Sequence, residues 1–172
     1  MLYLEEYQHL FETVEIPAKT VLLREGSIAQ KIYFIKQGCV RLWFNNDGRD
    51  ITFQFFFEGQ TIASMESFRN NLPSQFSLET IEPGVLLSMT KKDFFAILDT
   101  SSEFRKVVEN YFFERLLTYQ QLFLSRIKDS PQKRYQELLK EHPEILQRIP
   151  QHYIASYLGI TSVSLSRIRN RK

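Results

Sequence analysis

The chain has 172 residues, of which 43% are hydrophobic and 24% are charged, and its formal net charge is only +2. This hydrophobic content is ample for a packed core and excludes a disordered chain, while the single cysteine, Cys39, excludes an internal disulfide and a cysteine-ligated cluster. Glu5 and Glu6 interrupt the only candidate signal sequence, and no apolar run approaches the ~20 residues of a membrane span, so we expect a cytoplasmic protein without membrane contact.

The first half of the chain predicts a short helix followed by many strands. Leu4, Tyr7 and Phe11 recur at helical spacing within residues 1–12, and from Thr13 onwards the hydrophobic period is two. The expected strands are 21–24, 32–36, 39–44, 50–57, 76–81 and 85–89. Glycine-containing turns separate them, and Asn46-Asp47-Gly48 lies between two alternating runs. This regular alternation of short strands and turns predicts an antiparallel barrel or roll.

Two helices are expected after the strands. Thr90-Lys-Lys-Asp93 and Thr100-Ser-Ser-Glu103 resemble capping boxes, which predicts helices over 91–98 and 101–128. The second helix would span roughly 40 Å at ~1.5 Å per residue. It is apolar over much more than the single stripe that packing on one barrel requires.

The surplus apolar stripe of the long helix predicts a partner helix, most simply the same helix of a second copy. The residues expected at this dimer contact are Val108, Phe112, Leu116, Tyr119, Leu122 and Phe123. The alternative is a helix buried centrally in a single subunit. It is the weaker interpretation because the chain has too few other helices to surround it.

The chain then predicts a hinge and a short helix. In Asp129-Ser130-Pro131, Ser130 can cap a helix whose first position is Pro131. The helix is expected over 132–141, because His142-Pro143 breaks the pattern, and 144–148 leads into the last segment.

Residues 150–172 predict two short helices around a tight turn. Ile154, Ala155 and Leu158 fall at helical spacing, and Gly159 can adopt the left-handed conformation that ends a helix. Thr161 or Ser162 can cap the next helix, in which Leu165 and Ile168 form a narrow apolar seam.

The opposite face of this last helix carries short polar residues and arginines, and the segment has no acidic residue. This pattern is typical of a helix-turn-helix that meets a polyanion. The residues expected to contact DNA are Ser162, Val163, Ser166, Arg167, Arg169, Asn170, Arg171 and Lys172. The alternative is a helical hairpin whose basic residues are merely solvated, but such a helix end would more often carry Glu and Lys than Ser and Arg.

The order of these elements resembles the Crp/Fnr (catabolite activator and fumarate-nitrate regulator) family of bacterial transcription factors. Glu25-Gly26 followed by residues 32–41 is similar to the start of the family's cyclic-nucleotide-binding roll, and Asp47-Gly48-Arg49 matches its hairpin. Residues 154–161 with Leu165-Ser166-Arg167 match its DNA-reading end.

The resemblance implies an α+β fold. An antiparallel β-roll of the double-stranded β-helix, jelly-roll-like kind would form a sensor domain over 1–100. A long dimerisation helix over 101–128 and a helix-turn-helix DNA-binding domain over 129–172 would follow it. The family usually has a β-hairpin wing after the recognition helix, and this sequence stops at Lys172, so the wing is expected to be absent or truncated.

The implied function is a homodimeric, sequence-specific transcriptional regulator that binds double-stranded DNA, with RNA polymerase as a candidate partner and no cofactor. Arg167 would reach a guanine edge, with Ser162, Val163 and Ser166 beside it. Arg169, Arg171 and Lys172 would hold phosphates. The alternative is a roll that binds a small molecule or a protein and whose DNA-binding end no longer functions.

The sensor roll departs from the family's cyclic-nucleotide pocket. Ser64 stands where the family has the glutamate that takes the ribose hydroxyl, and Ser74 stands where it has the arginine that takes the phosphate. A buried phosphate needs a guanidinium or a run of amides, so cyclic AMP is not expected to bind in the usual way. Glu66 and Arg69 lie in the same predicted loop and would serve another effector, or form an ordinary surface pair.

Other chemistries have little support in the sequence. His9, His142 and His152 are too scattered for a metal site, and no nucleophile, base and orienting group stand in a recognisable arrangement, so an enzyme on a cupin-like barrel is a distant alternative. Cys39 is expected in the core. Trp43 and the run Phe53, Phe55, Phe56 and Phe57 are candidates for a ligand cavity, for barrel core or for the dimer contact.

Overall fold

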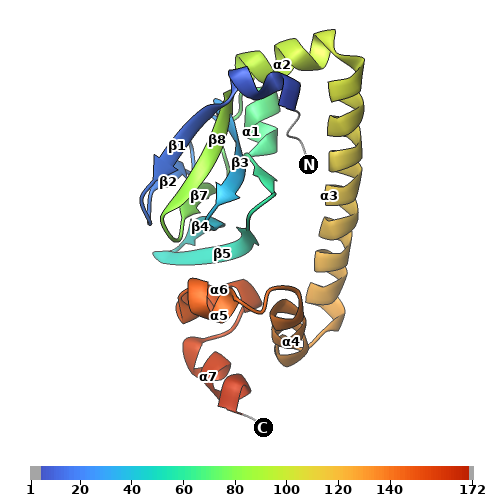
Figure 1. Ribbon diagram of the computed structural model, residues 1–172. Helices are drawn as coiled ribbons and strands as arrows, with labels where there is room; N and C mark the ends of the chain where they lie inside the picture. Colours follow the sequence, from blue (N-terminus) through green and yellow to red (C-terminus); the bar gives the residue numbers. More distant parts are fainter. Residues whose placement is uncertain (1–4, 171–172) are drawn as a thin grey trace.

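The structure is a computed structural model that describes residues 5–170, with side chains from Tyr7 onwards. A β-roll is followed by one long helix along its side and by a group of short helices at its far end (Figure 1). The opening segment differs from the prediction. The 3-10 helix η1 covers only Glu5–Leu10, strand β1 already begins at Glu12, and Leu4 lies outside the described residues.

The β-roll consists of two four-stranded antiparallel sheets, with strand orders β1-β8-β3-β6 and β2-β7-β4-β5. Its strands are β1 Glu12–Ile16, β2 Val21–Leu23, β3 Lys31–Gln37, β4 Val40–Asn46, β5 Arg49–Phe56, β6 Thr61–Ile62, β7 Ser77–Thr80 and β8 Gly84–Thr90. Buried residues of both sheets, including Ile35, Leu78 and Leu86, form the core of the roll. The predicted antiparallel roll is confirmed, although β1 and the two-residue β6 were not predicted.

The hairpin between β4 and β5 has the predicted turn. Asp47 and Gly48 adopt positive φ angles of 50° and 82°, and Asn46 pairs with Arg49 across them. Two successive residues of positive φ form the type I′ turn that matches the twist of an antiparallel pair. The Gly48 N–H also donates to Asn45 Oδ1 at 3.0 Å.

Helices α2 (Lys91–Thr100) and α3 (Ser102–Lys128) follow the roll. Thr90 caps α2 as predicted, because its Oγ1 accepts from the Asp93 N–H at 3.1 Å. The predicted cap of the long helix is wrong by one residue. Ser101 Oγ accepts from the Phe104 N–H at 3.1 Å, whereas Thr100 Oγ1 donates back to the Ala96 carbonyl and closes α2.

One helix falls where a loop was predicted. Helix α1 (Met65–Asn70) has only six residues, which is too short for a hydrophobic period to be visible in the sequence. It is fixed by tertiary packing, since Phe68 is fully buried and its ring lies 5.5 Å from that of Phe94 and 5.7 Å from that of Phe95.

The C-terminal unit, residues 131–170, consists of α4 (Pro131–Glu141), α5 (Ile145–Arg148), α6 (Gln151–Leu158) and α7 (Ser162–Asn170). Ser130 caps α4 and Pro131 stands in its first turn, as predicted. Gly159 ends α6 with a φ of 69°, and Thr161 Oγ1 accepts from the Ser164 N–H at the start of α7.

The C-terminal unit shares a hydrophobic core with the roll, which the sequence did not indicate. Phe55 and Phe57 of the β5 end pack in one buried cluster with Ile154, Leu158 and Leu165 of α6 and α7. The predicted core position of Cys39 is confirmed in the same cluster, and burial raises the pKa of its thiol far above the ordinary value. The roll therefore buries side chains between its own sheets and also on its outer face.

Arg148 adds a polar clamp between the two parts. Its guanidinium donates to Glu82 Oε1 at 3.0 Å and to Glu58 Oε1 at 2.7 Å, both on the roll. Partial burial raises the pKa of the Glu58 carboxyl, but hydrogen bonds from Arg148 and from backbone amides outweigh this effect, so the pKa lies below its ordinary range.

We expect Arg148→Met to lower the free energy of unfolding by about 1–2 kcal/mol at pH 7, since charge-assisted hydrogen bonds contribute ~1.5–3 kcal/mol and partial exposure screens them. Because the pKa of Glu58 is lowered in the folded protein, this stabilisation is present above its unfolded pKa and is lost as the pH falls through the folded value. Urea unfolding of both proteins should therefore show a difference that shrinks below about pH 4. Arg24→Met, at an exposed arginine of the roll, is the matched control; a pH-independent difference would contradict the clamp.

Within residues 5–170, no helix is both long enough and apolar enough to cross a membrane.

Candidate nucleic-acid interface and effector cavity

The outward face of α7 carries the residues predicted to meet DNA. Leu165 is fully buried and Ile168 packs against the shared core, so the opposite side of the helix faces solvent. Helix α7 also lies at the end of the molecule away from the roll (Figure 1). The exposed members of the predicted set are Ser162, Val163, Ser166, Arg167, Arg169 and Asn170, whereas Arg171 and Lys172 lie outside the described residues.

Helix α6 lies between α7 and the roll and makes specific contacts with β4 and β5. The Thr52 N–H donates to Ser156 Oγ at 2.9 Å, and the Tyr153 ring lies 3.9 Å from the Arg41 guanidinium. Arg41 is 2% exposed and its Nη2 lies 3.2 Å from Glu79. The exposed face of α7 is therefore supported by α6, which packs against the roll.

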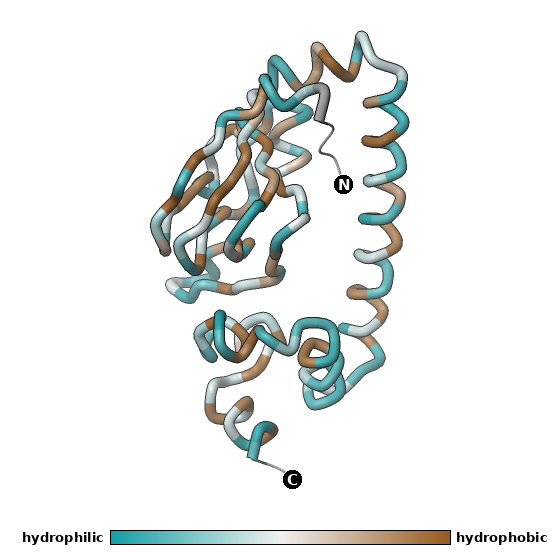
Figure 2. Tube along the Cα trace, viewed as in Figure 1, coloured by the Kyte–Doolittle hydropathy of each residue, from teal (hydrophilic) through white to brown (hydrophobic). Residues whose placement is uncertain are grey.

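Helix α3 has one buried and one exposed apolar side. Phe104 and Val108 are buried against the roll and α2. Hydrophobic residues nevertheless recur along the whole helix (Figure 2), and many of them are exposed. The exposed ones, here called the α3 stripe, are Phe112, Phe113, Leu116, Leu117, Tyr119, Phe123, Leu124 and Ile127.

Two residues of the expected dimer contact do not belong to the α3 stripe. Val108 is only 5% exposed and packs inside the subunit, and Leu122 is half-buried beside the hinge. The structure therefore removes Val108 from the exposed face on which the sequence placed it. The helical spacing of Val108 and Phe112 could not separate the two sides, because both sides of α3 are apolar.

The four residues expected to form an effector pocket do not converge on one cavity. The Oγ atoms of Ser64 and Ser74 lie 2.8 Å apart, and Ser74 Oγ also lies 2.6 Å from the Phe76 carbonyl oxygen, so this pair is closed and buried. Glu66 and Arg69 are exposed on α1, and Glu66 accepts a hydrogen bond from Gln75. Among the described residues no ion pair joins Glu66 to Arg69.

Glu66 and Arg69 line a cavity of about 690 Å³ between α1, α2 and α3. Another cavity, of about 460 Å³, lies between the roll and α3 and includes Glu66 in its lining. Its walls are mainly apolar and include Leu42, Phe53, Phe56, Ile62 and Phe76. The predicted phenylalanine run is split between two roles, since Phe55 and Phe57 pack against the C-terminal unit. A register shift produces the split: Leu42 pairs with Gln54 and Trp43 with Thr52, which leaves Phe53 without a cross-strand partner.

Helix α3 contributes two polar side chains to this cavity, Tyr111 and Arg115. The Tyr111 hydroxyl donates to the Thr61 carbonyl at 2.6 Å, and burial raises its pKa. The Arg115 guanidinium lies between two rings, 4.8 Å from that of Phe56 and 4.7 Å from that of Tyr119. The sequence analysis did not single out Arg115, although it is one turn from Tyr111 on the same side of the helix.

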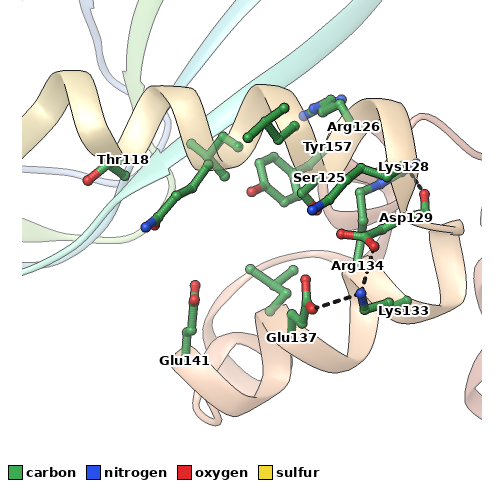
Figure 3. A pocket seen from close by; sticks show the side chains of 14 residues that line it. Thr118, Ser125, Arg126, Lys128, Asp129, Lys133, Arg134, Glu137, Glu141 and Tyr157 are labelled. Atoms are coloured by element: carbon green, nitrogen blue, oxygen red, sulfur yellow. Dashed lines mark hydrogen bonds and ion pairs between the residues drawn. The ribbon is translucent and has the colours of Figure 1, made fainter.

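A further cavity, of about 410 Å³, lies at the hinge between α3 and α4 (Figure 3). Several of its charged groups have partners within the chain. Lys133 lies 2.7 Å from Asp129 and 3.8 Å from Glu137, and Arg134 donates to the carbonyls of Asp129 and Leu158. The hinge is thus held by its own ion pairs and tied to α6.

The histidines have packing roles where their contacts are visible. His142 stacks on Phe57 with ring centroids 4.2 Å apart, and His152 lies against Tyr153. No group of three or more His, Cys, Asp or Glu side chains within residues 5–170 is arranged to hold a metal ion.

An antiparallel roll followed by a long helix is also the arrangement that comparison with known proteins identifies. The cyclic nucleotide-binding domain family matches residues 13–101, just over half of the chain, and the chain belongs to this family. No curated protein sequence matches it significantly.

Solved structures with the same fold include Crp/Fnr regulators. FixK2 from Bradyrhizobium japonicum is 15% identical with a TM-score of 0.79, over 94% of this chain and 83% of FixK2. The catabolite activator protein of Thermus thermophilus is 20% identical with a TM-score of 0.60, over 96% of this chain and 79% of that protein. The c-di-GMP-responsive regulator CLP from Xanthomonas campestris is 15% identical with a TM-score of 0.70, over 95% of this chain and 87% of CLP.

Proposed function

We propose that the protein is a homodimeric, sequence-specific DNA-binding transcriptional regulator of the Crp/Fnr type. Residues 1–100 form a sensor roll, 101–128 a dimerisation helix and 129–172 a helix-turn-helix domain in which α7 is the recognition helix. The protein acts on double-stranded DNA in the cytoplasm, with RNA polymerase as a candidate partner.

The observation that carries this proposal is the exposed face of α7. Short hydroxyl side chains, the Val163 methyl groups and Arg167 stand on one side of a helix whose other side is buried. An α-helix of this kind fits the major groove, where Arg reads guanine and an apolar group meets the thymine methyl. The α3 stripe supports the dimer, which would present two such helices to successive major grooves.

The proposal is tested by selecting bound sequences from random duplex DNA and measuring the affinity for the selected duplex by fluorescence anisotropy. Deleting residues 150–172 is a poor control, because Ile154 and Leu158 belong to the core shared with the roll. Arg167→Ala with Arg169→Ala removes two exposed charges from α7 without touching that core. Arg24→Ala with Arg49→Ala removes two exposed charges from the roll and should leave binding unchanged. Recovery of no enriched sequence would refute the proposal.

Cyclic AMP is expected not to bind in the usual way. Ser64 and Ser74 are 2% and 3% exposed and hydrogen-bonded to each other, so these two positions offer neither the carboxylate nor the guanidinium that the family's pocket uses for ribose and phosphate. A buried phosphate without such a partner carries a large desolvation cost. Titration calorimetry with millimolar cyclic AMP should show no saturable heat. A micromolar dissociation constant would mean that another part of the roll holds the phosphate.

A further inference from the structure

Two buried polar atoms of the cavity between the roll and α3 have no hydrogen-bond partner among the described residues. One is a terminal guanidinium nitrogen, Nη2, of Arg115. The other is the hydroxyl Oγ1 of Thr61, which lies near the Tyr111 hydroxyl, but that hydroxyl donates its proton to the Thr61 carbonyl. Thr61 is only 6% exposed, and both residues line the cavity. Buried polar groups in folded proteins are nearly always paired, so a donor and a hydroxyl at one apolar cavity indicate a missing partner.

The guanidinium of Arg115 has no anionic partner within the described chain. The rings of Phe56 and Tyr119 lie against the guanidinium through cation–π contacts, and its buried Nη2 is left without a hydrogen-bond partner. Glu66 also lines the cavity, but it is exposed and accepts a hydrogen bond from Gln75, which keeps its charge at the solvated rim.

We propose that this cavity binds a small amphipathic carboxylic acid, with the carboxylate on Arg115 and the Thr61 hydroxyl and the apolar body against the phenylalanine walls. The guanidinium edge matches a carboxylate in shape. One guanidinium and one hydroxyl suit a single negative charge, whereas a phosphate dianion requires more donors. This carboxylic acid is the effector of the sensor roll, and its regulatory role rests on the function proposed above.

The position of the cavity links its ligand to the proposed dimer contact. Phe112, Leu116 and Tyr119 belong both to the cavity lining and to the α3 stripe. A bound apolar body therefore touches side chains that the second copy of α3 would cover. Ligand binding and dimerisation are expected to favour each other, because both cover the apolar side chains of Phe112, Leu116 and Tyr119 and so remove them from water.

The test is titration calorimetry of the full chain with decanoate and 2-naphthoate, and with decanol as a probe without charge. Wild-type protein should bind at least one acid saturably. Arg115→Met keeps an apolar side chain of similar length and should weaken acid binding at least tenfold while leaving decanol binding unchanged. Lys106→Met removes one exposed charge from the same helix and should change neither.

Thr61→Val provides a second variant that does not depend on the stability of Arg115→Met. Replacing a buried, unpaired hydroxyl with a methyl group should not harm the fold, and acid binding should weaken at least threefold. Wild-type protein that binds neither acid, or Arg115→Met that binds them as well as wild type, would overturn the proposal.

DNA binding without ligand separates this result from the proposed function. Arg115 is on α3 and is not one of the residues proposed to contact DNA, so Arg115→Met should keep the wild-type affinity for the selected duplex within about twofold. Acid binding without any DNA binding would support the ligand site and refute the proposed regulator. DNA binding without acid binding would support the regulator and refute the ligand site.

Discussion

Leu116→Glu is expected to convert a dimer into a monomer at micromolar concentration. Leu116 is 63% exposed in the single chain and stands between Phe112 and Phe123 in the α3 stripe. Covering a leucine contributes roughly 1.5–3 kcal/mol, whereas covering an unpaired carboxylate costs several kcal/mol. In a symmetric dimer both copies carry the change, so the dissociation constant should rise by at least about a hundredfold.

Sedimentation velocity measures this result directly, and the circular dichroism spectrum should remain that of wild type because the substituted side chain is exposed. Gln121→Glu adds the same charge to an exposed position outside the α3 stripe and should leave the dimer intact. Leu122→Glu is a poorer choice, since Leu122 is half-buried within its own subunit and its loss would perturb the hinge. A wild-type protein that sediments as a monomer at micromolar concentration would contradict the assignment of α3.

The features that the sequence predicted correctly are local ones. The Asp47-Gly48 turn, the Thr90 and Ser130 caps and the left-handed Gly159 each depend on a few neighbouring residues. The error at Thr100 has the same origin, because two adjacent hydroxyl residues fit one cap and only Ser101 receives the Phe104 N–H.

The features that the sequence did not predict depend on contacts between distant segments. The hydrogen bond from Thr52 to Ser156 joins residues 104 positions apart, and no period within β5 or α6 indicates it. The shared core of the roll and the C-terminal unit rests on many such contacts. They make the two predicted domains less independent than a hinge at Asp129 suggests.

The predicted effector pocket depends on side-chain contacts that a family pattern does not contain. Ser64 and Ser74 lie close together, but their short side chains are buried and hydrogen-bonded to each other. The polar groups of the cavity come from Thr61 and from Arg115 on α3. The sequence could not single out Arg115, because the same helix also carries Arg105 and Arg126, whose guanidinium groups donate to backbone carbonyls in the structure.

Arg167→Ala and Arg169→Ala are expected to affect DNA binding in different ways. Arg167 lies four residues after Val163, so both side chains stand on the same outward side of α7, where a bidentate contact to guanine is worth roughly 1–3 kcal/mol of discrimination. Its removal should flatten the preference for the selected sequence. Arg169 lies two residues further, which turns it away from that side, so it is placed to meet phosphates.

Arg169→Ala should therefore weaken specific and scrambled duplexes alike. It should also lower the slope of log affinity against log salt by about one unit for each phosphate that the protein no longer neutralises, and by twice that in a dimer. Arg167→Ala should weaken mainly the specific duplex, with a smaller change in the salt slope. Fluorescence anisotropy at four salt concentrations, on both duplexes, separates the two effects. If Arg167→Ala weakens both duplexes equally while Arg169→Ala weakens only the specific one, the recognition helix enters the groove with the Arg169 side towards the bases, and the roles of the two arginines are exchanged.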